Sequence, residues 1–278
     1  MKKVFLIITI FLYTTLFAYV DSDFDGVDDS SDRCPNTPFM ELVDINGCTT
    51  KSLVPPSNLD IIIGGSYSDS DYQTISQTDT LVSSIQIDYY YKNFSLQAST
   101  SYFKTKGSGY QAKGMYDTFV GASYQFDLVK ALSIKVGGGV ILPTYKTSLN
   151  NNKTDYVGSF NFSYTLNKFS IFGGYSYTII NDKDITIIYN TNTLQNIKYK
   201  DTNSFNGGIG YYVTQDLYAN VSYNSSNSIY VTSKDIQTAS IYTYYSIDEH
   251  WFSTFSYARG VSKSASKNYL SWRLGYFF

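Results

Sequence analysis

The last ten residues, Tyr269-Leu270-Ser271-Trp272-Arg273-Leu274-Gly275-Tyr276-Phe277-Phe278, alternate between two sets of side chains. The even-numbered positions are all large and apolar, whereas Ser271, Arg273 and Gly275 between them are small or polar. Successive side chains of a strand point to opposite faces of a sheet, so this pattern predicts a β-strand with one apolar and one polar face.

The same two-residue period recurs from residue 59 to the end of the chain. A soluble antiparallel sheet would show the same alternation. The lengths of the strands and of their connections therefore have to distinguish a soluble sheet from a membrane-spanning one. The apolar-polar segments approach or exceed the 9–11 residues that cross a bilayer with tilt. They predict an all-β fold, an antiparallel transmembrane β-barrel of about 12 strands. The expected strands are 59–68, 80–91, 94–104, 114–126, 131–143, 154–166, 169–181, 202–213, 217–226, 235–246, 250–259 and 269–278.

The connections alternate between tight turns and longer loops, as in outer-membrane barrels with short periplasmic turns. We expect both termini of the barrel on the periplasmic side, and a projecting hairpin in the longest loop. Barrels of 10 or 14 strands, and a secreted β-sandwich or adhesin, are the alternative folds. The tight turns are at 92–93, 127–130, 167–168, 215–216 and 248–249, and the loops are at 69–78, 104–113, 144–153, 182–201, 226–234 and 260–268.

Composition excludes several classes of protein. The 278 residues are 18% aromatic and only 16% charged, and a mean hydropathy of -0.20 excludes a bundle of membrane-spanning helices. A net charge of -2 gives no electrostatic reason to expect a nucleic-acid partner.

The first 18 residues predict a secretory signal peptide. Lys2 and Lys3 precede an apolar run from Val4 to Phe17, and Ala18 is a small residue suited to a cleavage site. An uncleaved N-terminal anchor is the alternative. The mature chain is expected to be exported.

Residues 19–51 are strongly acidic, with eight Asp and Glu against two basic residues. Asp21, Asp23 and Asp25 alternate, Gly26 allows a sharp turn, and Asp32 follows at a distance that can close an oxygen-lined loop. Calcium takes six to eight oxygen ligands from such loops. A solvated acidic linker is the alternative. Residues 52–58, with Pro55-Pro56, predict a linker before the barrel at 59–278.

The acidic run is followed by Cys34-Pro35-Asn36-Thr37-Pro38 and Val43-Asp44-Ile45-Asn46-Gly47-Cys48. Together they resemble a thrombospondin type 3 repeat, of the kind found in outer-membrane proteins related to OmpA. The resemblance implies a Cys34–Cys48 disulfide, Ca²⁺ as the bound cofactor, and a cell-wall or periplasmic partner for this segment. The implied calcium ligands are Asp21, Asp23, Asp25, Val27, Asp29 and Asp32.

The C-terminal strand also resembles the assembly signal of Gram-negative outer-membrane proteins, carried here by Trp272, Leu274, Tyr276 and Phe278. The resemblance implies outer-membrane lipid and the barrel assembly machinery as partners. We expect one aromatic girdle near the tight turns and the C-terminus, formed by Tyr89, Tyr91, Phe94, Tyr124, Phe126, Phe169, Tyr211, Trp251, Tyr276 and Phe278.

Five charged residues can be placed clearly within the expected strands, and all five fall on the polar face: Asp60, Asp88, Asp117, Lys135 and Arg273. We expect them to line a lumen, with Asp88 and Arg273 as the first candidates for tuning the passage of solutes. The alternative is an internal salt-bridge network, because closure of the barrel makes Arg273 a neighbour of Asp60. Gly137-Gly138-Gly139 predicts a bend or close packing against a large side chain.

No arrangement of residues indicates an enzyme. The single histidine, His250, follows a tight turn and is expected to be a solvated turn residue. The sequence predicts a small outer-membrane channel for hydrophilic solutes with a periplasmic calcium-binding segment. A non-conducting structural or adhesive surface protein is the alternative, and the acidic segment as a calcium-sensitive plug is a third hypothesis.

Overall fold

The computed structural model describes residues 21, 23, 27, 29, 32–34, 43, 57–70, 78–107, 110–129, 131–145, 153–189 and 193–278. The chain divides into two units, Met1–Val54 and Pro55–Phe278. Every regular element in the described ranges is a β-strand. No helix among these residues is both long and apolar enough to cross a bilayer.

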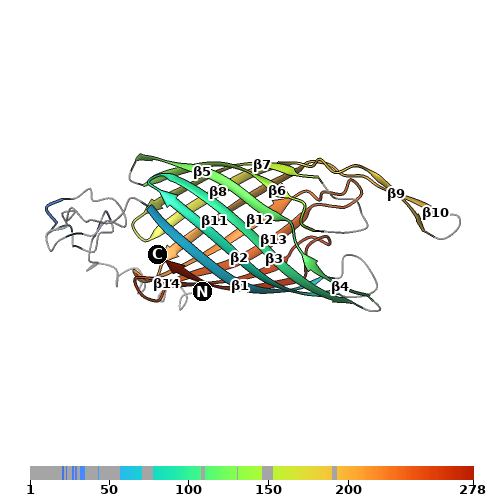
Figure 1. Cartoon of the computed structure of the whole chain (residues 1–278). Coiled ribbons are helices and arrows are strands. Elements are labelled where there is room, and N and C mark those ends of the chain that lie inside the picture. Colours follow the sequence, from blue (N-terminus) through green and yellow to red (C-terminus); the bar gives the residue numbers. More distant parts are fainter. Residues whose placement is uncertain are drawn as a thin grey trace, which may run out of the picture. The chain divides into compact units, whose positions relative to one another are not determined.

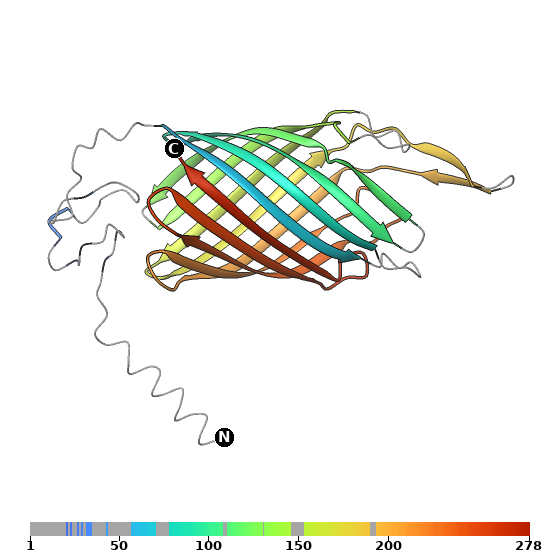
Figure 2. The same ribbon diagram turned by 60° about the horizontal axis from the view of Figure 1, so that its bottom comes forward.

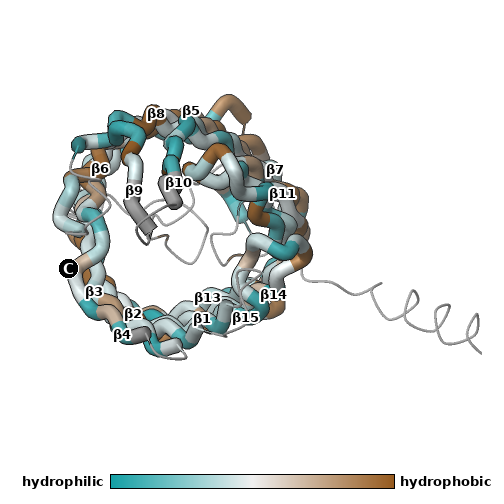
Figure 3. The backbone as a smooth tube through the Cα atoms, turned by 90° about the vertical axis from the view of Figure 1, so that its right-hand side faces the viewer, coloured by the Kyte–Doolittle hydropathy of each residue, from teal (hydrophilic) through white to brown (hydrophobic). Residues whose placement is uncertain are grey.

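The second unit is a closed antiparallel barrel (Figures 1 and 2). Each strand of the wall pairs with the next, and pairing of the last strand with β1 completes the ring seen end-on in Figure 3. The wall strands are β1 (Ser57–Ser70), β2 (Thr78–Tyr91), β3 (Phe94–Gly107), β4 (Tyr110–Met115), β5 (Thr118–Val129), β6 (Leu132–Leu142), β7 (Asp155–Leu166), β8 (Phe169–Ile179), β11 (Thr202–Tyr212), β12 (Leu217–Ser226), β13 (Ile236–Ser246), β14 (Trp251–Gly260) and β15 (Asn268–Phe277).

The wall has twelve strand positions, because β4 and β5 occupy one position between them. Both pair with β3, β4 through Tyr102↔Met115 and β5 through Ser99↔Phe119. The strand expected at 114–126 is therefore interrupted at Tyr116 and Asp117. The predicted antiparallel barrel of 12 strands is confirmed.

One loop prediction was wrong. Residues 104–113 contain three lysines and were expected to form a loop, but β3 and β4 continue their ladder through Lys104↔Lys113 as far as Gly107↔Tyr110. The lysines end the apolar pattern of the sequence, but they do not end the hydrogen-bonded ladder. Where a strand continues beyond the apolar band of the barrel, its side chains lie in water and can be charged. As a result β1, β2 and β3 each have 14 residues.

Tight turns gather at one end of the barrel, which we call the turn end. Tyr91 pairs with Phe94 and Leu166 with Phe169 across two-residue turns. Lys92 and Asn167, the first residue of each turn, have a φ of 51°. The C-terminus lies at this end too, since the Phe278 amide donates to the Leu59 carbonyl at 2.9 Å. The opposite end carries the longer connections and is called the loop end.

The longest connection, at the loop end, contains a separate hairpin of β9 (Ile185–Tyr189) and β10 (Thr193–Ile197). These strands pair only with each other, from Ile185↔Ile197 to Tyr189↔Thr193. Figures 1 and 2 show the hairpin extending beyond the wall strands. The expected projecting hairpin is confirmed.

The outer face of the wall is apolar and exposed. Leu81, Ile85 and Ile87 of β2 are exposed, while the alternate Ser84 and Gln86 face the interior. The expected girdle residues lie on this face near the turn end. Their rings contact one another in pairs, with centroids 4.8 Å apart for Tyr124–Phe126, 4.9 Å for Phe169–Tyr211 and 4.6 Å for Tyr276–Phe278.

A second aromatic group, which sequence analysis missed, lies on the outer face near the loop end. The hydroxyl of Tyr67 donates to Asp79 at 2.9 Å, and that of Tyr175 donates to Asn203 at 2.6 Å. Each ring belongs to the apolar face while its hydroxyl reaches a polar partner. This is the arrangement of a tyrosine at a boundary between an apolar and an aqueous phase.

Candidate functional site

The inner wall of the barrel is the candidate functional site. Small hydroxyl side chains of neighbouring strands bond to each other across it, as in Ser95–Ser123 at 2.6 Å and Ser222–Ser240 at 2.7 Å. Among the described residues, none of the larger side chains is less than 2% exposed, and only Ile62, Phe103, Phe252 and Ala265 are buried apolar residues. A barrel filled by its own side chains would cover its larger inward side chains almost completely. None of the large side chains among the described residues is covered to that extent.

Several aromatic rings lie flat on the inner wall, over glycines. A Cβ added to Gly121 or Gly139 would overlap the ring of Phe119, and one added to Gly275 would overlap the ring of Phe252. Because glycine has no side chain, each ring can lie close to the backbone. The ring then projects little into the interior of the barrel. The expected close packing at Gly137-Gly138-Gly139 is confirmed at Gly139.

Asp60 and Asp88 face each other on the inner wall near the turn end. They are register partners on β1 and β2 and are only 5% and 6% exposed. Side chains directly opposite in an antiparallel pair have Cβ atoms about 4.5–5.5 Å apart. The Oδ1 atom of Asp60 is buried without a hydrogen-bond partner among the described residues.

Arg273 reaches across β1 toward these acids without contacting them. It is the register partner of Gly64, and its Cγ lies in the space that a Cβ on Gly64 would need. Its guanidinium donates to Gln86 Oε1 at 2.5 Å, and Gln86 Nε2 donates to Asp88 Oδ2 at 2.6 Å. Gln86 therefore stands between Arg273 and Asp88, and within the described wall no ion pair joins Arg273 to Asp60.

The other two charged residues of the expected lumen lie elsewhere. Lys135 is on β6, opposite Gln125 and Asn161. Asp117 is not within a strand, as was expected, but in the break between β4 and β5, where its Oδ1 accepts the Tyr145 amide at 2.8 Å. The break exists because Tyr116 and Asp117 leave the ladder, although the Tyr116 amide still donates to Ser101.

Further acids at the loop end hold backbone amides. Asp155 Oδ1 accepts the Asn181 amide at 2.8 Å, and Asp201 Oδ1 accepts that of Ile180 at 2.9 Å. Hydrogen bonds from the Tyr177 hydroxyl and the Ile180 amide lower the pKa of Asp201. Burial raises the pKa of Asp182, whose Oδ1 accepts the Lys153 amide. These acids were not among the predicted site residues: Asp182 and Asp201 fall in the expected loop 182–201, and Asp155 lies at the end of the expected strand 154–166.

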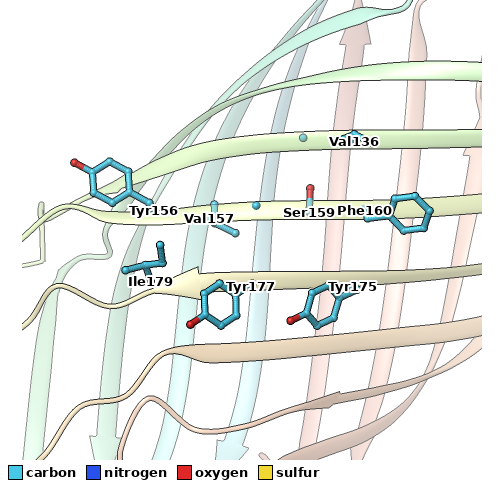
Figure 4. A pocket seen from close by; sticks show the side chains of 10 residues that line it. Val136, Tyr156, Val157, Ser159, Phe160, Tyr175, Tyr177 and Ile179 are labelled. Atoms are coloured by element: carbon cyan, nitrogen blue, oxygen red, sulfur yellow. The ribbon is translucent and has the colours of Figure 1, made fainter.

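A groove of about 540 Å³ lies on the wall over β6, β7 and β8 (Figure 4). Tyr156, Phe160, Tyr175 and Tyr177 of the outer face line it. Gly158 provides open space there, since a Cβ added to it would meet nothing within 4 Å. The groove belongs to the outer surface of the wall.

In the first unit the structure describes five of the six expected calcium ligands; Asp25 lies outside the described residues. Asp23 is 8% exposed, and Asp32 Oδ1 accepts the Cys34 amide at 2.7 Å. Across the described positions, no group of three acidic, His or Cys side chains could hold a metal ion. Cys48 also lies outside these positions, so both the calcium site and the Cys34–Cys48 disulfide stay predictions.

His250 lies in the turn between β13 and β14. Its amide and that of Trp251 both donate to Asp248 Oδ1 at 2.8 Å, and its ring stacks on Tyr276 with centroids 5.5 Å apart. The two backbone amides lower the pKa of Asp248. The exposed His250 thus forms part of a structured turn.

No family model and no curated protein sequence matches the chain. Among solved structures, an outer membrane channel from Pseudomonas putida F1 is similar, with a TM-score of 0.67 and 10% identity over 82% of this chain and 97% of that chain. The NanC porin is similar with a TM-score of 0.47 and 14% identity, over 78% of this chain and 98% of the porin. The β domain of the Bordetella autotransporter BrkA is similar with a TM-score of 0.48 and 8% identity, over 80% of this chain and 98% of that domain. The similarity to the Pseudomonas putida channel is one of fold, a closed antiparallel β-barrel.

Proposed function

We propose that this chain is an outer-membrane channel for the passive passage of small hydrophilic solutes, and not an enzyme. The observation that carries the proposal is the inner wall, which is lined by hydrogen-bonded Ser, Thr, Asn and Gln side chains. In its described part none of the larger side chains is less than 2% exposed. An interior of this kind is suited to water and polar solutes. The similarity in fold to an outer membrane channel is consistent with it.

The outer face supports the proposed location in the outer membrane of a Gram-negative bacterium. It carries an apolar band between two aromatic groups, one near each end, as expected for a barrel that spans a bilayer. Short periplasmic turns are the rule in such barrels, so we assign the turn end and both termini to the periplasm. Lipid surrounds the band, and the barrel assembly machinery is the proposed partner for insertion.

Single-channel recording of the refolded mature chain in a planar bilayer tests the proposal. We expect discrete conductance steps in KCl, and a changed conductance when Asp88→Asn or Arg273→Gln alters the charge of the inner wall. A chain that inserts and shows the heat-modifiable gel mobility of a folded barrel, but conducts no current, would contradict it.

The same recording tests the proposed calcium-binding segment. Calcium bound by Asp21, Asp23, Asp25, Val27, Asp29 and Asp32, with a Cys34–Cys48 disulfide, would make this segment a rigid module. We expect the isolated mature chain to bind calcium in solution and to lose it when Asp23→Asn and Asp25→Asn are combined. A conductance that differs between calcium and chelator would give the module a role in gating.

The β9–β10 hairpin favours a second function, adhesion at the cell surface with the barrel as an anchor. The hairpin pairs with no wall strand, and its own pairing can be removed without breaking the barrel ladder. Replacing residues 185–197 by a short Gly-Ser linker should abolish surface binding if the hairpin is adhesive, while assembly is unchanged. Retained binding would contradict an adhesive role for the hairpin.

A further inference from the structure

The feature that carries the inference is the pair of carboxylates Asp60 and Asp88 inside the barrel. Two negative groups directly opposite each other on adjacent strands repel, and this destabilises the pair unless something compensates the charge. Both side chains are more than nine-tenths buried, and Asp60 Oδ1 is buried without a hydrogen-bond partner among the described residues. A buried acceptor without a donor is costly, so the pair is poised to accept one.

The compensating charge is not supplied by the wall. Arg273 of the inner wall donates to Gln86, and the Gln86 amide donates to Asp88. This chain of hydrogen bonds orients the Asp88 carboxylate, but in the described barrel neither acid forms an ion pair with Arg273. Asp60 accepts no hydrogen bond from this chain.

Aromatic side chains share this part of the inner wall with the two acids. Phe277 is the register partner of Asp60 on β15, and its ring lies 4.6 Å from that of Phe252, which in turn lies 5.4 Å from the ring of Tyr244. Tyr90 is close enough to influence both carboxylates electrostatically, as Tyr244 is to influence Asp60. The inner wall at the turn end therefore combines two carboxylates with aromatic side chains from four strands, β2, β13, β14 and β15.

These groups fit a particular class of cation. A metal ion such as calcium requires more oxygen ligands than this pair offers, and no metal-binding group of three side chains is found in the described residues. A protonated primary amine brings three N–H donors for the carboxylate oxygens and a carbon chain for the rings. Aromatic faces attract such cations as well.

We infer that Asp60 and Asp88, with Phe252, Phe277 and Tyr244, form a binding subsite for organic cations that carry a primary ammonium group. The inference deepens the proposed channel function, since such a subsite on the inner wall would make primary amines a favoured class of solute. A quaternary ammonium ion lacks N–H donors and is a poorer ligand, because it leaves Asp60 Oδ1 unsatisfied.

Equilibrium binding to the refolded full-length barrel at pH 7.5 tests the subsite without requiring conduction. The probes are 2-phenylethylammonium and, as the comparison, phenyltrimethylammonium, titrated by isothermal calorimetry. We expect the primary amine to bind about tenfold more tightly, the effect of one additional hydrogen bond to a charged group. Asp60→Asn should remove most of this preference. Asp127→Asn is the matched control, because Asp127 is exposed at the turn end and already accepts from Gln125 and Ser133.

The outcomes separate the subsite from the channel when the same preparations are recorded in bilayers with KCl. Conductance with no preference for the primary amine overturns the subsite and leaves the channel standing, and a shared proton between the two acids would give this result. Preferential binding without conductance supports the subsite and overturns the channel. If Asp60→Asn fails to fold, as judged by heat-modifiable mobility, Phe277→Leu replaces it, and unchanged binding in that variant overturns the role of the rings.

Discussion

Gly275 has no side chain, and the ring of Phe252 occupies the space above it on the inner wall. The same relation holds for Gly139 under Phe119 and for Gly210 under Tyr218. At the residue scale, glycine thus decides how much of the interior is left open. A ring that lies flat against the backbone takes less of the interior than a ring that stands out from it.

Gly275→Ala should narrow the interior. The added methyl group cannot coexist with the present position of Phe252, so the ring must swing away from the wall toward the axis, at a cost of about 1–3 kcal/mol in stability. We expect a lower single-channel conductance than in the wild type. Gly158→Ala is the matched control, because its methyl group would enter open space on the outer face. Equal conductance of the wild type and both variants would contradict the role given to Gly275.

The two acids of the inner wall show where residue-level prediction stopped. Alternation placed Asp60 and Asp88 on the polar face, but not opposite each other. Their pairing depends on the register between β1 and β2, which are joined by residues 71–77, and a long loop does not fix register as a two-residue turn does. The contact of Arg273 with Gln86 also required the closure of the barrel.

Among the elements, the wall strands were predicted most completely. A two-residue period marks each strand, and every one of the twelve expected segments corresponds to a position in the wall. The errors fall at the loop end. There the strands continue past the apolar band. Charged residues such as Lys104 and Lys113 were therefore assigned to a loop, although their backbone is paired. The second aromatic group was missed because only one girdle was expected, near the tight turns, whereas Tyr67 and Tyr175 lie toward the other end of their strands.

The turn between β13 and β14 gives a pH-dependent prediction. Two amides lower the pKa of Asp248, so the ionised carboxylate stabilises the turn above the ordinary value of about 3.9, and this contribution is lost as the pH falls through the lowered pKa. We expect hydrogen-exchange protection of the His250 and Trp251 amides, corrected for intrinsic rates, to fall only below about pH 4. In Asp248→Asn the protection should not depend on pH in this range. Loss of protection already near pH 5 in the wild type would show that the pKa is not lowered.

For the whole molecule, the C-terminal residue distinguishes assembly from stability. Phe278 is 65% exposed on the outer face and contacts the ring of Tyr276, so the folded barrel depends little on it. If Phe278 acts as part of an assembly signal, Phe278→Ala should reduce the amount of folded barrel in the outer membrane several-fold, yet refold in detergent like the wild type. Leu270→Ala, exposed on the same face of β15, is the control. If both variants reduce the amount of folded barrel equally, the loss of apolar surface explains the reduction, and Phe278 has no special role in assembly.

The seam between β1 and β15 has a consequence for how the chain reaches its native state. Asp69 and Asn268 bond across this seam although 199 residues separate them in the chain. Until the last strand is present, the growing sheet has two unpaired edges, each of which can pair with another chain and begin aggregation. Contacts between such distant residues also form slowly, because the intervening chain must first be ordered. The nascent chain therefore has to be held apart from its copies until β15 is present, and a chain truncated before residue 268 lacks the strand that closes this barrel.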